Sequence, residues 1–399
     1  MLDRPADLPT VFLNPGGDRR LSQGHPWAYA NEVRIDAAGK ALESGTVARL
    51  ARVDGKPLGI GMFNPHALIA FRLLDRDPSV AVDGAWLSGR VGRALALRRR
   101  LFAEPFYRLV HAEADALPGL VVDRFDDVAV VQANTAGMDR LLPLVIEAVE
   151  AAINPAVVVV RNDSRARALE GLDRTVVVVK GEVGGPVPVR EDGLVFFADV
   201  LTGQKTGWFF DQRRNRAFAA PLAEGGAMLD LFCHTGGFAV RAAAGGASPV
   251  LGIDTSEPAL ALARQAAAAN GVDARCTFRR GEVFQSLEAL ITEGARFRLV
   301  VADPPAFVKS RKELAAGLRG YRKLARLAAR VVEPGGFLFL ASCSHNVEAA
   351  GFAAECAAGL AKAGRTGRIL RAAGAGPDHP IHPHLPETAY LKTLVLQLD

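Results

Sequence analysis

One short stretch, Ala227–Ala244, limits most strongly what this chain can fold into. It contains an apolar run with an acid at Asp230, a turn that holds Gly236 and Gly237, and an alanine-rich helical pattern. A strand, a glycine turn and a helix in this order open a nucleotide-type site at the carboxyl end of a parallel strand. The dinucleotide fingerprint G-x-G-x-x-G is absent, so a pyrophosphate is not the expected ligand.

Three later expected strands keep the same pattern, because each carries a polar group at its carboxyl end. These groups are Asp254, Asp303 and Cys343. Parallel strands bring such ends to one edge of a sheet, where ligands bind. An acid inside the first strand suits the ammonium group of S-adenosylmethionine, and Asp254 suits its ribose hydroxyls. Asp254 could also be an N-cap for the helix that follows, and both roles can hold at once because its carboxylate has two oxygens.

The sequence alternates strand and helix from residue 227 onward. Expected strands cover 227–232, 250–254, 275–279, 298–302, 336–342, 367–372 and 389–398. Seven strands fit a doubly wound, Rossmann-like α/β sheet whose last strand is inserted antiparallel. Earlier hairpin signals predict a small β-barrel module at 1–75 and a central α+β domain at 76–190, which leaves 191–399 for the doubly wound domain.

Composition excludes several classes of protein. The 399 residues suggest two or three domains, and no apolar run reaches the roughly 18 residues that span a bilayer. The first ten residues lack a signal-peptide pattern, and the four cysteines give no disulfide framework. We therefore expect a cytoplasmic protein without a membrane partner. The net charge of +5 and the arginine clusters at 98–100 and 213–216 fit a nucleic-acid partner.

The turn Asp303-Pro304-Pro305-Ala306-Phe307 is the clearest catalytic signal. Its prolines fix a rigid backbone, so that a carboxylate and an aromatic ring face the substrate side of the sheet. Such turns are typical of methyltransferases that act on planar bases. The pattern alone does not say which atom of the base is methylated.

Cys343 favours carbon 5 of a pyrimidine. Carbon 5 is a poor nucleophile until a thiolate adds to carbon 6 and forms an enamine, which attacks a methyl sulfonium. This chemistry needs a partly exposed thiol in an electropositive site, and Asp303 would assist at the N3 edge of the base. The alternative is that Cys343 is a small buried hydrophobe. The other cysteines, Cys233, Cys276 and Cys356, are expected to be structural.

Together these residues resemble the bacterial and archaeal 23S rRNA 5-methylcytosine methyltransferases with an N-terminal PUA domain, over nearly the whole chain. The matching motifs, besides the Asp303 turn, are Gly24-His25-Pro26-Trp27, Lys205-Thr206-Gly207, Asp211-Gln212-Arg213, Phe232-x-x-Thr235-Gly236-Gly237-Phe238, Gly320-Tyr321 and Ser342-Cys343-Ser344. The resemblance implies S-adenosylmethionine as methyl donor, a PUA module, a central RNA-binding domain and a Rossmann-like catalytic domain with Cys343 as nucleophile. Two positions depart from it: Ala306 replaces the second cysteine of other RNA 5-methylcytosine enzymes, and Glu282 stands where Asp is expected.

We therefore expect three sets of functional residues. The catalytic residues are Cys343 and Asp303. Cofactor contacts are expected from Asp230, Phe232, Thr235, Gly236, Gly237, Asp254, Ser256, Glu282, Val283, Asp303 and Gln212. Substrate contacts are expected from Pro304, Pro305, Phe307, Lys309 and Arg213. The histidines His379, His382 and His384 match no common metal site, so no metal is expected.

The expected partner is 23S rRNA or its precursor, and the resemblance leaves room for a homodimer. Two other functions stay open. An enzyme that methylates an amino group of an RNA purine needs the Asp303 turn but not Cys343. An RNA-binding assembly factor that keeps the cofactor fold without turnover needs neither catalytic residue.

Overall fold

The computed structural model describes residues 8–399. The first seven residues of the expected N-terminal module lie outside the described residues. They include most of the ten residues that lack a signal-peptide pattern. The chain forms two compact units. The first contains the chain up to Val187 with Val200–Gly207 and Asp378–Thr388, and the second contains Pro188–Asp199, Trp208–Pro377 and Ala389–Asp399. Between residues 8 and 399, no helix is long and apolar enough to cross a membrane.

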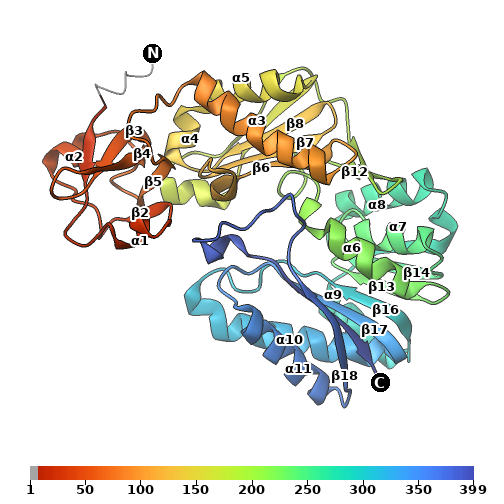
Figure 1. Ribbon diagram of the computed structural model, residues 1–399. Coiled ribbons are helices and arrows are strands. Elements are labelled where there is room, and N and C mark those ends of the chain that lie inside the picture. The colour runs from red at the N-terminus through yellow and green to blue at the C-terminus, as the bar shows by residue number, and fades with distance from the viewer. Residues whose placement is uncertain (1–7) are drawn as a thin grey trace. The chain divides into compact units, whose positions relative to one another are not determined.

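The N-terminal part of the first unit is a five-stranded sheet with the strand order β1-β3-β4-β5-β2 (Figure 1). The expected hairpin is present, since β3 and β4 pair antiparallel from Thr46↔Phe63 to Ala51↔Pro57. Leu50, Phe63 and Phe71 are fully buried in its core. The strands are β1 (Thr10–Phe12), β2 (Trp27–Tyr29), β3 (Thr46–Ala51), β4 (Pro57–Phe63) and β5 (Ile69–Asp75).

A second five-stranded sheet, ordered β10-β9-β8-β7-β6, follows in the same unit. The helices α3 (Gly84–Leu101) and α5 (Leu142–Ile153) pack against each other and share its apolar core (Figure 1). β7 and β8 form a hairpin, with Asp126 in the left-handed conformation between them. The strands are β6 (Phe106–His111), β7 (Leu120–Phe125), β8 (Val128–Ala133), β9 (Val157–Asn162) and β10 (Thr175–Lys180).

The second unit is built on a seven-stranded sheet with the order β15-β14-β13-β16-β17-β19-β18. Strands β13 to β17 are parallel, whereas β19 lies between β17 and β18 and runs antiparallel to both. This confirms the expected doubly wound sheet with its last strand inserted antiparallel. The strands are β13 (Met228–Leu231), β14 (Val250–Asp254), β15 (Cys276–Arg280), β16 (Phe297–Ala302), β17 (Val332–Ser342), β18 (Gly367–Ala373) and β19 (Lys392–Leu398).

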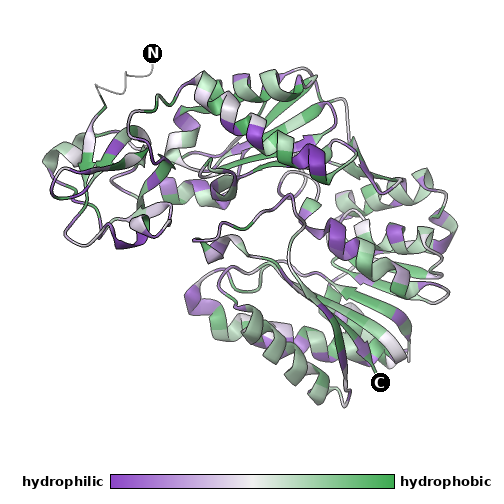
Figure 2. Ribbon diagram, in the orientation of Figure 1, coloured by the Kyte–Doolittle hydropathy of each residue, from purple (hydrophilic) through white to green (hydrophobic). Residues whose placement is uncertain are grey.

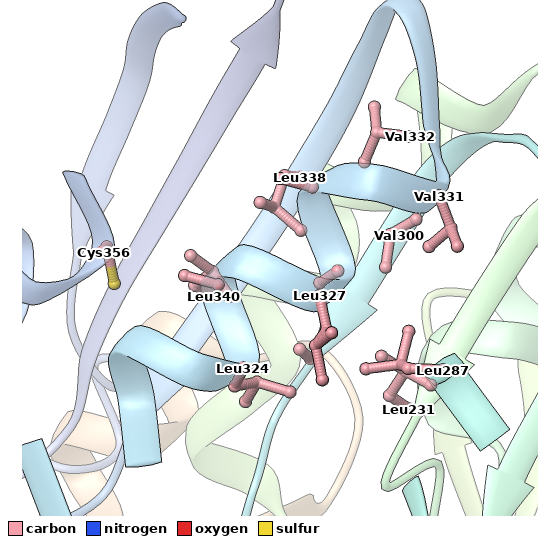
Figure 3. Close-up of a cluster of buried hydrophobic side chains, with 14 of the residues drawn as sticks. Leu231, Leu287, Val300, Leu324, Leu327, Val331, Val332, Leu338, Leu340 and Cys356 are labelled. Carbon is pink, nitrogen blue, oxygen red and sulfur yellow. The ribbon is translucent and has the colours of Figure 1, made fainter. Parts of the chain in front are cut away.

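Helices cover both faces of this sheet. Figure 3 shows Leu338 and Leu340 in an apolar cluster with Leu324 and Leu327 of α10. Phe339, which alternates with these leucines, instead packs 5.0 Å (between ring centroids) from Phe238 of α7. In Figure 2 the strands of this sheet are mostly hydrophobic, as expected for a sheet covered on both faces. The helices are α6 (Arg213–Ala219), α7 (Gly237–Ala244), α8 (Glu257–Ala269), α9 (Val283–Thr292), α10 (Leu314–Val331) and α11 (Ala349–Lys362).

One expected strand was wrong. The pattern of 191–197 predicts a single strand, but the structure has a hairpin of β11 (Val187–Glu191) and β12 (Leu194–Ala198). Asp192 and Gly193, both at positive φ, form its turn. An Asp-Gly pair between two short strands favours a two-residue hairpin loop, and this local signal ends the strand at Glu191.

Candidate active site

The loop after β13 has an unusual backbone. Phe232, His234 and Gly236 have φ angles of 61°, 49° and 77°, which lie in the left-handed region. Only glycine adopts this conformation freely, and strained backbone of this kind gathers at functional sites. A Cβ atom on Gly236 would lie 2.9 Å from the Cβ of Ala263 in α8, so this glycine also allows the loop to pack against the helix.

Two acids hold this loop in place. The carboxylate of Asp230 accepts a hydrogen bond from the Ala239 backbone N–H at 3.0 Å, and its side chain is buried beneath α7. Asp254 accepts from the backbone N–H of His234 and of Ser256, both at 2.9 Å. Asp254 therefore ties the end of β14 to the loop after β13. Ser256, rather than Asp254, is the N-cap of α8, which corrects the alternative role for Asp254.

Burial shapes the electrostatics of this loop. It raises the pKa of Asp230 well above its ordinary value, and the nearby charges of Asp303 and Asp254 raise it further. Because an unpaired carboxylate is unfavourable at such a position, the site is suited to a ligand with a positive charge. The ammonium group of S-adenosylmethionine has this property.

Thr235 gives an independent sign of a ligand. Its side chain is 2% exposed, and its Oγ1 atom has no hydrogen-bond partner within residues 8–399. Buried hydroxyl groups are nearly always hydrogen-bonded, and an orphaned one calls for an explanation. A polar cofactor bound at the loop would supply the missing partner, so the residues of this loop fit S-adenosylmethionine.

Asp303 stands at the end of β16, beside the loop after β13. Its backbone N–H lies 3.4 Å from the carbonyl oxygen of Leu231. Its Oδ2 atom accepts a hydrogen bond from Gln212 Nε2 at 2.8 Å. Gln212 is itself oriented, since its Oε1 atom accepts from Asn215 Nδ2 at 2.7 Å. Gln212, which we expected at the cofactor, thus contacts the predicted catalytic carboxylate.

Cys343 follows β17, the strand next to β16, and lies against the same turn. Its Sγ atom is 3.9 Å from the carbonyl oxygen of Pro304. The side chain is partly exposed, whereas Cys233 and Cys356 are buried. The structure therefore brings together Cys343 and Asp303, which are 40 positions apart in the chain.

The other three thiols are poorly suited to nucleophilic attack. Burial raises the pKa of Cys233 and of Cys356 well above the ordinary thiol value, and it raises the pKa of Cys276 to about 11. Cys356 belongs to the apolar cluster shown in Figure 3. The expected structural role of these cysteines agrees with their surroundings.

Tyr321 connects the turn that holds Asp303 with the segment that holds Cys343, and the sequence motif Gly320-Tyr321 did not reveal this contact. Its hydroxyl group lies 2.9 Å from Ser342 Oγ and 2.8 Å from Ser344 Oγ, the neighbours of Cys343. The same hydroxyl accepts from the Phe307 backbone N–H at 3.4 Å. Burial raises the pKa of Tyr321, so the phenol stays neutral and able to donate. Its position fixes the Cys343 segment relative to the Asp303 turn.

The remaining expected site residues differ in their surroundings. Glu282 is exposed at the start of α9, and Lys309 is exposed after the proline turn. Val283 is 2% exposed within the apolar core, where its side chain serves packing. Pro304 is buried and Pro305 is exposed. The ring of Phe307 packs 4.7 Å from that of Tyr321.

The arginine clusters are only partly available to a nucleic acid. Arg98 is fully buried in an ion pair with Asp115 at 2.6 Å. Arg216 binds the buried carboxylate of Glu191 at 2.5 Å, and Arg213 lies 3.5 Å from the same carboxylate. The side chains of Arg98, Arg213 and Arg216 therefore form ion pairs within the protein. This corrects the expectation that all arginines of the two clusters face a nucleic acid. The exposed members are Arg99, Arg100 and Arg214.

Comparison with known families agrees with this geometry. Residues 154–395 match the family model described as S-adenosylmethionine-dependent methyltransferase. The chain belongs to this family. Its cofactor is therefore S-adenosylmethionine, and residues 11–76 match the model of a PUA-like domain.

Relatives of this methyltransferase align over almost its full length. Ribosomal RNA large subunit methyltransferase I of Shewanella denitrificans is 34% identical over 393 residues, which cover 97% of this chain and 99% of the relative. The protein of the same name from Aeromonas hydrophila is 36% identical over 394 residues, with the same coverage.

Solved structures show the same fold. A Streptococcus mutans protein described as a SAM-dependent methyltransferase superposes with a TM-score of 0.82 at 18% identity, over 98% of this chain and 100% of its own. The structure of SMU.776, described as a methyltransferase in complex with SAH, gives a TM-score of 0.84 at 18% identity. At this identity the likeness concerns the fold alone.

Proposed function

We propose that this methyltransferase transfers a methyl group from S-adenosylmethionine to carbon 5 of a cytosine in 23S rRNA, through a covalent bond between Cys343 and the base. One observation carries the proposal. A partly exposed thiol lies 3.9 Å from the Pro304 carbonyl oxygen, beside the turn that holds Asp303. Methylation of an exocyclic amino group would need the turn but not the thiol.

Cys343 and Asp303 have distinct roles in this reaction. The Cys343 thiolate adds to carbon 6, and the electron pair of the 5,6 double bond becomes available at carbon 5. S-adenosylmethionine held at the loop after β13 would supply the methyl group: carbon 5 would take the methyl from the sulfonium, and S-adenosylhomocysteine would leave with the electron pair of the broken bond between sulfur and the methyl carbon. Asp303, aligned by Gln212, stabilises the adduct through the N3 edge of the base. Loss of the carbon 5 proton to a base then restores the double bond and releases the thiolate.

Release of the product must occur without a second thiol beside the turn. Position 306, where other RNA 5-methylcytosine enzymes carry a cysteine, is Ala306. Carbon 5 therefore loses its proton to a group other than a cysteine. Because Cys343 both adds and leaves, a single thiol is sufficient for the cycle.

The loop after β13 would hold the cofactor. Thr235 Oγ1 offers an unsatisfied hydrogen-bonding group, and Asp230 offers a buried carboxyl for the ammonium. The remaining expected contacts, from Phe232, Gly236, Gly237, Asp254, Ser256 and Glu282, are proposed on their place at the carboxyl ends of the strands.

An RNA substrate is proposed from the names of the relatives, which are ribosomal RNA large subunit methyltransferases. We assign the PUA-like module at 1–75 and a central domain at 76–190 to RNA binding, and 191–399 to catalysis. Exposed arginines such as Arg99, Arg100 and Arg214 would contact phosphates, so that RNA binding weakens with salt. The target cytosine must leave its stack to reach Cys343.

The decisive experiment is methyl transfer from labelled S-adenosylmethionine to deproteinised 23S rRNA, followed by nucleoside analysis. Wild type is compared with Cys343→Ala and with Cys276→Ala, a control that removes a half-buried thiol on β15. We expect label in 5-methylcytidine that disappears only in Cys343→Ala. Label in a purine, or label that persists without Cys343, would support the amino-group alternative. Cofactor binding without label in any RNA would support an assembly factor.

A further inference from the structure

A buried lysine lies next to Cys343. Lys392 is the first residue of β19, and it is 9% exposed. It pairs directly with Ser342 across the antiparallel ladder between β17 and β19. Residues opposite one another in such a ladder have their Cβ atoms about 4.5–5.5 Å apart. The pairing therefore places Lys392 opposite the residue that precedes Cys343.

The ammonium group of Lys392 is held by neutral partners. Its Nζ atom donates to the carbonyl oxygen of Ser344 at 2.6 Å and to that of Tyr390 at 2.7 Å. In the part of the chain that the structure describes, no carboxylate lies within ion-pair distance of it. A buried cation without a counterion is unfavourable, because burial removes its hydration. A charged Lys392 beside the Cys343 segment therefore needs a functional explanation.

Among the groups around Cys343, the thiol itself interacts with the charge of Lys392. Burial lowers the pKa of Lys392, and the charge of the Cys343 thiolate raises it, so the lysine and the thiol influence each other. Tyr321 is a neutral phenol, and the turn beside Cys343 carries the carboxylate of Asp303. The ring of His345 stacks on that of Tyr390, with their centroids 5.4 Å apart, and the Tyr390 hydroxyl donates to the carboxylate of Asp211. Lys392 supplies the buried positive charge in this set.

We propose that Lys392 is a positioning residue whose ammonium group keeps Cys343 in its thiolate form. The inference rests on the proposed function, since it explains how a cysteine beside an acidic turn becomes a nucleophile. The thiol proton leaves to solvent, Nζ keeps its own three protons, and no bond to Lys392 forms or breaks. The two carbonyl contacts hold Nζ in place, one of them at Ser344, the residue that follows Cys343.

The test measures how fast iodoacetamide alkylates Cys343 as a function of pH, with the modified peptide identified by mass spectrometry. No RNA is present. A free thiol has a midpoint near about pH 8.5, and we expect the wild-type midpoint clearly below it. In Lys392→Met, which keeps the length of the side chain without its charge, the midpoint should rise by about one pH unit, so that alkylation slows about tenfold at neutral pH.

Two controls accompany this measurement. Lys392→Arg keeps the charge and should keep the low midpoint, whereas a purely structural role would not move the midpoint in either variant. Cys276, whose pKa is raised to about 11, serves as the internal reference thiol. Urea unfolding and binding of S-adenosylhomocysteine establish that each variant is folded. If Lys392→Met does not fold, the inference is judged by whether the wild-type midpoint lies below about pH 8.5.

A wild-type midpoint at or above about pH 8.5 would overturn the inference, as would an unchanged midpoint in folded Lys392→Met. Failure here is distinct from failure of the proposed function. If the midpoint rises in Lys392→Met but no RNA carries 5-methylcytidine, the proposed reaction is wrong and the role of Lys392 still holds. Label in 5-methylcytidine with an unshifted midpoint would do the reverse.

Discussion

Gln212 Nε2 donates a hydrogen bond to Asp303 Oδ2 at 2.8 Å, while Gln212 Oε1 accepts from Asn215. The amide is thus fixed on both sides and orients the carboxylate at the end of β16. Gln212 is 2% exposed and Asp303 is half-buried, so the amide side of this hydrogen bond is shielded from water, which strengthens the bond. This pair makes Asp303 rigid before any base arrives.

Gln212→Ala should therefore slow methyl transfer without changing the affinity for S-adenosylmethionine by a comparable factor. A hydrogen bond to a charged group contributes about 1.5–3 kcal/mol, which corresponds to a loss of roughly 10- to 160-fold in rate. Single-turnover transfer to RNA and calorimetric binding of S-adenosylhomocysteine separate the two effects. An equal loss in both would mean that Gln212 serves the cofactor, as the sequence suggested.

Tyr321→Phe should destabilise the catalytic turns. The variant removes one hydroxyl group and leaves the hydroxyls of Ser342 and Ser344 without their buried partner. We expect a loss of about 1–3 kcal/mol in the free energy of urea unfolding, together with slower methyl transfer. A double-mutant cycle with Ser344→Ala should show a coupling energy of about 0.5–3 kcal/mol. Additive effects would contradict a role for this hydroxyl in joining the turns.

Thr235→Val separates binding from stability. Because Oγ1 has no partner in the described part of the protein, its removal should leave the free energy of unfolding unchanged or slightly higher. Affinity for S-adenosylhomocysteine should fall by about 2- to 12-fold, the loss of one hydrogen bond of about 0.5–1.5 kcal/mol. The matched control is Thr393→Val. Thr393 is equally buried, but its hydroxyl donates to the Ala373 carbonyl oxygen at 3.2 Å, so this variant should lose stability and keep affinity.

Much of the second unit could be predicted from sequence, because its strands and turns are marked by residues that are close together in the chain. Apolar runs, one that contains Asp230 and three that end at Asp254, Asp303 and Cys343, define the parallel strands, and the carboxyl ends of these strands do meet at one edge of the sheet. The hairpin after Glu191 was missed because the strand pattern outweighed a single Asp-Gly turn signal.

The contacts that orient the catalytic groups could not be predicted in this way. Gln212 lies 91 positions from Asp303, and Lys392 lies 48 positions from Ser344. A lysine at the start of a strand normally points to solvent. The expected antiparallel insertion of the last strand did not include its register, and it is the pairing of Lys392 with Ser342 that places this lysine inside.

Asp230→Asn should stabilise the protein at neutral pH. Burial raises the pKa of Asp230 in the folded state above its value of about 3.9 in the unfolded chain, so the folded state binds the proton more tightly. The stability that this acid contributes is fully present below the unfolded pKa and is lost as pH rises through the folded pKa. The variant, which is neutral at every pH, avoids this loss, so its advantage should grow from about pH 4 to about pH 7.

Urea unfolding at both pH values measures the change in stability. Binding of S-adenosylmethionine measures how much Asp230 contributes to cofactor affinity. The amide that replaces the carboxyl group of Asp230 can still accept from the Ala239 N–H but cannot pair with an ammonium, so affinity should fall. Asp254→Asn is the contrasting control: both Asp254 oxygens accept backbone N–H groups, and replacing one oxygen by an amide nitrogen should destabilise the protein by about 1–3 kcal/mol. An Asp230→Asn protein that is less stable at neutral pH would show that Asp230 is ionised and already compensated within the fold.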